Sequence, residues 1–156
     1  MNMKEITLIG FCGLYCGACS QYLASQPDGR HILDKAISQG KNPEKFKCAG
    51  CRGAQVDLYP PCSQCKMRDC AKNKNLDHCG ICPEMPCDML KKFQTDGRPH
   101  HFDILRNLDE LKEHGCDKWL LNQKTKWKCA CGSKYNWYET DCNNCGATVN
   151  SYNKTR

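Results

Sequence analysis

The sequence has little of what builds a large hydrocarbon core or crosses a membrane. Of its 156 residues 40% count as hydrophobic, but 16 of these are cysteine and only 4 are phenylalanine. The mean hydropathy is −0.71. No apolar run approaches the ~20 residues that a membrane-spanning helix needs. We therefore expect no membrane partner, and a fold that needs stabilisation beyond the burial of apolar surface.

The first residues carry no recognisable export signal. The polar segment 1–5 leads into a short apolar stretch, 6–11, which Gly10 and Cys12 interrupt. A secretory signal has a basic start followed by a longer apolar region. We therefore expect a cytoplasmic protein, whose reducing surroundings keep thiols free and disfavour a disulfide scaffold.

Motifs of the common enzyme classes are missing too. The chain has no recognisable Ser-His-Asp arrangement, no glycine-rich phosphate loop and no H-E-x-x-H pattern. The pair His100-His101 follows a Gly-Arg-Pro turn and is most simply the start of a helix. The sequence therefore favours a protein that binds over one that catalyses.

Cysteine is what the chain has in excess, and only Cys116 stands apart from the clusters. Two thiolates close in sequence can chelate one ion, and a distant pair completes the tetrahedron. A structural zinc contributes on the order of 10 kcal/mol of apparent folding free energy, which would compensate for the thin core. The clusters are Cys12-x3-Cys16-x2-Cys19, Cys48-x2-Cys51, Cys62-x2-Cys65-x4-Cys70, Cys79-x2-Cys82-x4-Cys87, Cys129-x-Cys131 and Cys142-x2-Cys145.

The net charge of +6 is a weak argument for a nucleic-acid partner, because that sum treats every cysteine as neutral. Four thiolates around one Zn²⁺ carry a net charge of about −2, so about three such sites would cancel it. The distribution of charge says more, since basic residues outnumber acidic ones six to two in residues 121–156.

Hydrophobic spacing and capping signals predict several short helices and one longer helix that Gly115 ends. From Lys124 onward the chain becomes aromatic, basic and rich in turns, which puts a domain boundary near residue 122. We predict a small metal-stabilised α+β protein: an irregular cysteine-rich domain with short helices in residues 1–121 and a β zinc ribbon in residues 122–156. The helices are expected over Ser20–Ser25 (with Ser20 as N-cap), Arg30–Ser38, Met67–Asn73, Cys87–Gln94 and residues 100–114.

Two cysteine turns face each other near the C-terminus, Cys129-Ala-Cys131-Gly132 and Cys142-Asn-Asn-Cys145-Gly146. The glycine after each pair lets the backbone turn tightly and aim N–H groups at the thiolates. The flanks have strand character. This part resembles the zinc ribbons, a family of small β modules, which implies four thiolates around one zinc. It departs from them in its first turn, where C-x-C replaces C-x2-C, and a rubredoxin-like iron site uses similar turns.

The ribbon is also the expected contact surface for a protein or nucleic-acid partner. Trp127, Trp137 and Tyr138 would stack on bases while Lys128 and other lysines neutralise phosphates. In the alternative interpretation, one or two of these rings form the small core of the ribbon and the lysines keep it soluble.

Further motifs follow one another through the first domain: CGLYC (12–16) with CSQY (19–22), CAGC (48–51), Cys62-x2-Cys65, MRDCA (67–71), Cys79-x2-Cys82 and MPC (85–87). Over about residues 10–95, with eleven cysteines in register, the chain resembles domain of unknown function family 3795, found in bacteria and archaea. Met67 and Met85 depart from the family pattern. The resemblance implies a cytoplasmic, metal-binding domain and supplies no reaction.

Spacing leaves the grouping of these cysteines open. The simplest site joins two C-x2-C pairs, Cys16 with Cys19 and Cys48 with Cys51. A C-x2-C-x4-C element then occurs twice, offset by 17 residues, and predicts either one four-cysteine site or a binuclear cluster. His78 is an alternative ligand there, and Cys116 is expected to be a small buried hydrophobe. The repeated element comprises Cys62, Cys65, Cys70, Cys79, Cys82 and Cys87.

Cys12 gives the chain a second interpretation, because Cys12-x3-Cys16-x2-Cys19 is the spacing of radical S-adenosylmethionine enzymes. The chain is too short for the barrel of those enzymes. A simple iron–sulfur cluster in the first domain fits better, since C-x2-C segments ligate such clusters too. Spare thiols such as Cys12 or Cys70 would be sensors or zinc-exchange sites. The leading prediction is a multi-zinc structural and binding module, and the alternative is an iron–sulfur or redox-active protein.

Overall fold

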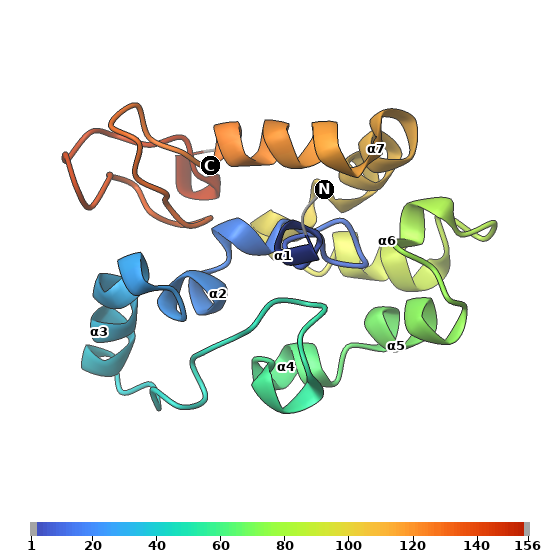
Figure 1. Cartoon of the computed structure of the whole chain (residues 1–156), viewed down its shortest axis with the longest axis horizontal. Helices are drawn as coiled ribbons and strands as arrows, with labels where there is room; N and C mark the ends of the chain where they lie inside the picture. Colours follow the sequence, from blue (N-terminus) through green and yellow to red (C-terminus); the bar gives the residue numbers. More distant parts are fainter. Residues whose placement is uncertain (1–2, 155–156) are drawn as a thin grey trace.

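The structure is a computed structural model that describes residues 3–154, and its regular structure is helical. The outermost residues of the two predicted domains, 1, 2, 155 and 156, lie outside the described residues. Short 3-10 turns link the helices at Cys16–Ala18, Pro27–Gly29, Gln55–Asp57, Cys79–Ile81, Pro99–His101 and Tyr152–Lys154. The α-helices are α1 (Met3–Ile6), α2 (Ser20–Ala24), α3 (Arg30–Ser38), α4 (Pro60–Ser63), α5 (Lys66–Asn73), α6 (Asp88–Gln94) and α7 (Ile104–Lys126), shown in Figure 1.

The predicted short helices are confirmed within one residue at each end. In α3 the residues Ile32, Leu33 and Ala36 are buried on one side, as the spacing of its apolar residues requires. One detail was wrong: the N-cap of α2 is Cys19, and Ser20 is already the first helical residue.

Helix α7 is the longest element and lies along one edge of the molecule, at the top of Figure 1. Gly115 interrupts it with φ 78° and ψ 167°, so the helical stretch expected up to residue 114 does end at this glycine. The chain then resumes a helix through Lys126, which the sequence analysis did not anticipate. Leu108 before the break and Trp119 after it are almost completely buried.

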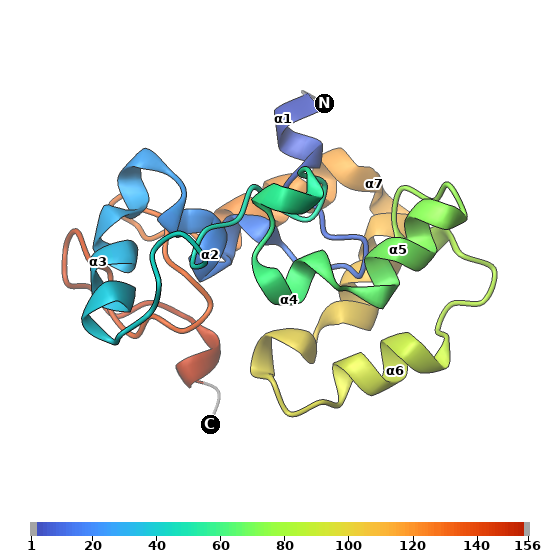
Figure 2. The same cartoon turned by 90° about the horizontal axis from the view of Figure 1, so that it is seen from below.

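The main core lies beneath α7 and includes both halves of the chain. Ile9, Tyr15 and Leu108 belong to the same buried cluster as Trp127 and Trp137. Seen from below, in Figure 2, the loop that follows α1 crosses in front of α7. A second, smaller cluster joins α2 to α3 through Leu23, Ala24, Ile32 and Leu33.

The prediction of a β ribbon, and with it the β part of the α+β class, was wrong. Within residues 3–154 there is no strand, only the isolated antiparallel bridges Ile9–Tyr15, Lys128–Lys134 and Asp141–Thr148. The reason lies in where the backbone donors of the C-terminal segment point. The N–H of Tyr135 bonds to the carbonyl of Trp127, whereas the N–H of Trp137 bonds to that of Ala18. Because consecutive donors on that face serve different segments, no ladder extends.

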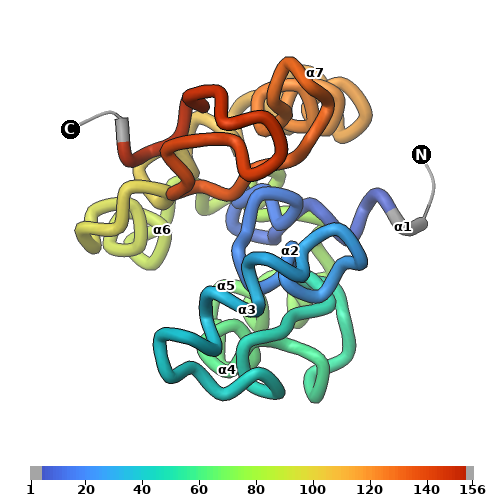
Figure 3. Tube along the Cα trace, turned by 90° about the vertical axis from the view of Figure 1, so that its left-hand side faces the viewer, coloured from blue at the N-terminus to red at the C-terminus, as the bar shows by residue number. Residues whose placement is uncertain are grey.

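The C-terminal segment, residues 127–154, packs directly against the rest of the chain. Figure 3 shows it beside α7 and close to the N-terminal segment, in agreement with the hydrogen bond to Ala18. Helix α7 also continues through residue 122, where the domain boundary is predicted. The division into two domains stays a prediction. No helix among residues 3–154 combines the length and apolar character needed to cross a membrane.

Candidate metal centres

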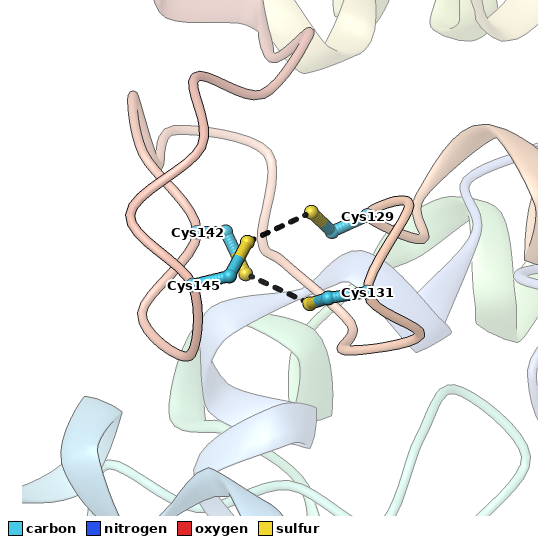
Figure 4. A group of neighbouring side chains, drawn as sticks. All are labelled: Cys129, Cys131, Cys142 and Cys145. Atoms are coloured by element: carbon cyan, nitrogen blue, oxygen red, sulfur yellow. Dashed lines mark hydrogen bonds between the residues drawn. The ribbon is translucent and has the colours of Figure 1, made fainter.

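The four C-terminal cysteines form a compact group. Their sulfur atoms all lie within 4.8 Å of one another. The sulfurs of Cys129 and Cys145 are 3.6 Å apart, as are those of Cys131 and Cys142. Figure 4 shows one pair of cysteines on each of two facing loops, with the sulfurs pointing into the space between them. Within the part of the chain that the structure describes, no other group of three or more His, Cys, Asp or Glu meets this distance limit.

This geometry fits a tetrahedral zinc ion. A Zn–S bond of about 2.3 Å places the sulfurs of a regular tetrahedron about 3.8 Å apart. Two of the sulfur pairs here are 3.6 Å apart and all four sulfurs lie within 4.8 Å of one another, so shifts of about an ångström or less would close them on an ion. Four thiolates would complete the coordination sphere and leave no position for a substrate. The predicted four-cysteine cluster is therefore confirmed as a group that could hold a metal ion.

Two tight turns position these thiols. In the first, the N–H of Gly132 bonds to the carbonyl of Cys129 at 2.8 Å, and the N–H of Cys129 bonds to that of Ser133 at 2.8 Å. The second turn repeats the arrangement around Cys142, with Gly146 and Ala147 as partners. Gly132 and Gly146 have φ 94° and 71°, the left-handed region that glycine adopts without strain. The shortened C-x-C turn is thus fully hydrogen-bonded.

Hydrogen-bond donors prepare one of these thiols to ionise. The pKa of Cys131 falls to about 5 because the backbone N–H and hydroxyl of Ser133, followed by the side-chain amide of Asn144, stabilise the thiolate. The Asn144 amide lies 3.6 Å from the Cys131 sulfur. Since metals bind thiolates rather than thiols, this environment favours metal binding at neutral pH.

The rings proposed to stack on a partner are mostly buried. Trp127 and Trp137 are 3% and 8% exposed, and Tyr138 is half-buried. The ring of His100 stacks on Trp137, and its Nδ1 shares a hydrogen bond with the Tyr138 hydroxyl. The rings therefore occupy the positions that the alternative, core-forming interpretation gives them. Lys128 is exposed beside the first cysteine turn.

In the N-terminal half the cysteines lie in looser groups, the first of which joins Cys16, Cys19, Cys48 and Cys62. The Cys48 and Cys62 side chains are hydrogen-bonded, which lowers the pKa of Cys48 and raises that of Cys62. The thiolates of Cys16 and Cys19 are also near enough to raise the pKa of Cys62. Spacing predicts a site of Cys16, Cys19, Cys48 and Cys51, and after burial the thiolates of Cys51, Cys19 and Cys48 do raise the pKa of Cys16. That grouping stays a prediction.

A second group joins Cys12, Cys51 and Cys65. Burial, followed by the Cys51 and Cys65 thiolates, raises the pKa of Cys12 well above its usual value. The third group comprises Cys70, Cys79, Cys82 and Cys87, which line one cavity. These groups adjoin one another, because Cys51 lies near both Cys16 and Cys12, and Cys79 lies near Cys12 and Cys65.

Local backbone structure presents many of these sulfurs in the same way. Cys19, Cys65 and Cys87 are the N-cap residues of α2, α5 and α6. At Cys19 the N–H groups of Tyr22 and Gln21 stabilise the thiolate, although burial raises the pKa of Cys19 to about 11 overall. The 3-10 turns at Cys16–Ala18 and Cys79–Ile81 end alike, with φ/ψ of −75°/129° at Cys19 and −71°/131° at Cys82. These two C-G-x-C turns therefore end in the same backbone conformation.

Arg68 belongs to the MRDCA motif (67–71), and its structural role was not predicted from the sequence. It is 2% exposed. Its guanidinium donates to the carbonyl of Cys51 at 3.0 Å, to the side-chain oxygen of Gln55 at 2.8 Å and to the carbonyl of Gly53 at 3.4 Å. Arg68 thereby fixes the loop that carries Cys51 onto α5. The one indication of this role in the sequence is the position of Arg68, two residues before Cys70.

Two further residues have simple environments. His78 is buried and its Nδ1 has no hydrogen-bond partner, while burial lowers its pKa and keeps the ring neutral. Cys116, expected to be a small buried hydrophobe, packs against the main core but is only half-buried on α7. All sixteen cysteines lie within residues 3–154, and all are free thiols.

The fold and these sites define a helical, cysteine-rich protein with one well-formed four-thiolate group. A family described as "Protein of unknown function (DUF3795)" matches residues 8–92, more than half of the chain, and the protein belongs to this family. The match includes all three N-terminal cysteine groups and ends before the C-terminal four. No curated protein and no solved structure matches the chain.

Proposed function

We propose that the protein is a non-enzymatic, multi-metal structural and binding module, with zinc in the C-terminal group and further thiolate-bound metal in the N-terminal half. The observation that carries this proposal is the spacing of the four C-terminal sulfurs, all within 4.8 Å of one another. A closed four-thiolate site stabilises a fold and offers no position for catalysis. Sixteen free thiols support a reducing, cytoplasmic location.

The metal would replace the hydrogen-bond ladder that the C-terminal segment lacks. Cys129 and Cys131 precede Tyr135, Trp137 and Tyr138, and Cys142 and Cys145 follow them. One ion would therefore fix both turns relative to each other, where isolated bridges supply little support. A rigid rim around the ion then presents side chains to a partner.

A protein or nucleic-acid partner would contact this rim through its polar side chains. Lys128, Asn143 and Asn144 are exposed there, whereas Trp127 and Trp137 are buried. This distribution favours contacts to phosphates or carboxylates over the stacking of bases on rings. In this proposal the role of Trp127, Trp137 and Tyr138 is to hold the segment in place, so that its polar side chains can contact the partner.

The zinc part of the proposal is tested by elemental analysis of the wild-type protein and of Cys131→Ser. We expect at least one zinc per wild-type chain and about one fewer in the variant, whereas Cys116→Ser retains the full amount.

The partner is tested by binding of mixed-sequence RNA and DNA at low salt. A tenfold or greater loss for Lys128→Glu, but not for the exposed Lys41→Glu, supports nucleic acid. No binding by the wild type would leave a protein partner.

A further inference from the structure

The third cysteine group surrounds a cavity of about 120 Å³ between α5 and α6, which lie on the same side of the molecule in Figures 1 and 2. Cys70 comes from α5, Cys79 and Cys82 from the two ends of a C-G-x-C turn, and Cys87 from the N-cap of α6. Four separate backbone positions thus direct thiols into one space.

The remaining walls are mostly apolar. Met67, Ala71, Leu76 and Leu90 line the cavity, and Lys74 and Glu84 are the charged residues at its rim. The Lys74 ammonium lies 3.9 Å from the Cys82 sulfur and 2.8 Å from a Glu84 carboxylate oxygen. An ammonium beside a thiolate offsets part of the negative charge that four ionised cysteines would gather.

The cavity differs from the C-terminal group in how its sulfurs are spaced. Within residues 3–154 only the C-terminal four bring three or more ligand atoms within 4.8 Å of one another. A single zinc draws four sulfurs to about 3.8 Å separation. In a four-iron cluster each thiolate binds a different iron atom, so the thiolates lie farther apart around a volume that iron and sulfide fill. Spread sulfurs around an open, apolar space match the second arrangement.

We propose that Cys70, Cys79, Cys82 and Cys87 hold an iron–sulfur cluster in this cavity, separate from the C-terminal zinc. This inference deepens the proposed function. It rests on one part of that function, namely that the N-terminal cysteines act as thiolate ligands. It assigns this cavity a cofactor of a different class from the one at the C-terminus. Lys74 is exposed, and Cys70, Cys82 and Cys87 are half-buried, so this side of the cavity faces solvent.

The test uses the full chain purified without oxygen, and again after anaerobic incubation with iron, sulfide and a thiol reductant. Iron, acid-labile sulfide and zinc are counted per chain, and the protein is examined by visible absorption and by electron paramagnetic resonance after reduction. We expect a brown protein with iron and sulfide in equal amounts. Cys82→Ser and Cys70→Ser should lose most of the iron and the colour while retaining the C-terminal zinc, which shows that they fold.

Two controls separate this inference from the proposed function. Cys131→Ser should lose zinc and keep iron, and Cys116→Ser should keep both. A colourless protein with zinc lost on Cys82→Ser overturns the cluster but leaves the multi-metal proposal standing. A wild-type protein with neither iron nor zinc overturns both.

Discussion

The imidazole of His100 stacks on the indole of Trp137, with ring centroids 4.3 Å apart and planes 15° apart. This contact joins the 3-10 turn before α7 to the loop between the two C-terminal cysteine turns. The C-terminal segment is therefore fixed on both sides, by the end of α7 at Trp127 and by this stacked pair. Any metal bound at the C-terminal group would be mechanically connected to the main core.

The buried position of His100 predicts a specific dependence of stability on pH. Burial, followed by the nearby His101 and Arg98, lowers the pKa of His100 to about 3. The unfolded chain, with a histidine pKa of about 6.5, binds this proton first, so stability falls as the pH drops from about 6.5 toward about 3. The slope for this one group reaches at most about 1.4 kcal/mol per pH unit. His100→Phe keeps the stacking and should flatten the curve.

The measurement is urea unfolding of both proteins between pH 7.5 and 5.5 (about one unit on each side of the ordinary histidine pKa), with the bound zinc counted at each pH. Buried His101 contributes a slope of the same sign in both proteins, because burial lowers its pKa too. Only the difference between the two curves reports on His100. Parallel curves would show that folding does not lower the pKa of His100.

Trp119 should be a main determinant of stability in α7. It is 1% exposed and meets Tyr15 edge-on, at a centroid distance of 6.1 Å. Trp119→Ala removes a large buried ring and should cost about 3–5 kcal/mol. Leu121, two residues away on the same helix, is 64% exposed, so Leu121→Ala should change stability by less than about 0.5 kcal/mol. Equal effects in urea unfolding would contradict the packing described for α7.

Arg68 should be needed for the loop that carries Cys51. Arg68→Leu leaves the Cys51 and Gly53 carbonyls and the Gln55 side chain without their donor, at a cost of about 2–4 kcal/mol. Arg68→Lys should recover only part of it, since an ammonium does not reproduce the fork of the guanidinium. Lys66→Leu, an exposed change on the same helix, is the control. Amide exchange that stays slow over residues 51–57 in Arg68→Leu would refute this role.

Removal of the metal should loosen the C-terminal segment before the rest of the fold. The segment from Cys129 to Val149 has bridges but no strand, so an ion would be its main crosslink. After chelation under reducing conditions, we expect faster amide exchange over residues 128–148 and little change in residues 104–112 of α7. Unchanged amide exchange over residues 128–148 after metal loss would show that these loops keep their structure without an ion.

Local features of the fold could be predicted from the sequence, and long-range ones could not. The apolar spacing in α3 and the glycine at Gly115 report directly on the backbone around them. The C-terminal cysteine group was also predictable, because both of its turns carry their own glycine. The strand prediction failed because the donor of Trp137 bonds to Ala18, far away in the sequence.

The same limit applies to the N-terminal cysteines. Spacing treats each C-x2-C pair as one unit that binds one ion. In the folded chain, Cys48 is hydrogen-bonded to Cys62, and Cys51 lies near both Cys16 and Cys12. These neighbours depend on how the loops pack together, with Arg68 of α5 donating to the Cys51 carbonyl. No pattern within either segment contains that information.

X-ray absorption at the zinc edge of the purified protein tests the central claim most directly. We predict bound zinc surrounded by four sulfur atoms at about 2.3 Å. Changing Cys131 to serine should remove about one zinc ion per chain. A protein without zinc, or zinc whose nearest neighbours are mainly nitrogen and oxygen, would contradict the account.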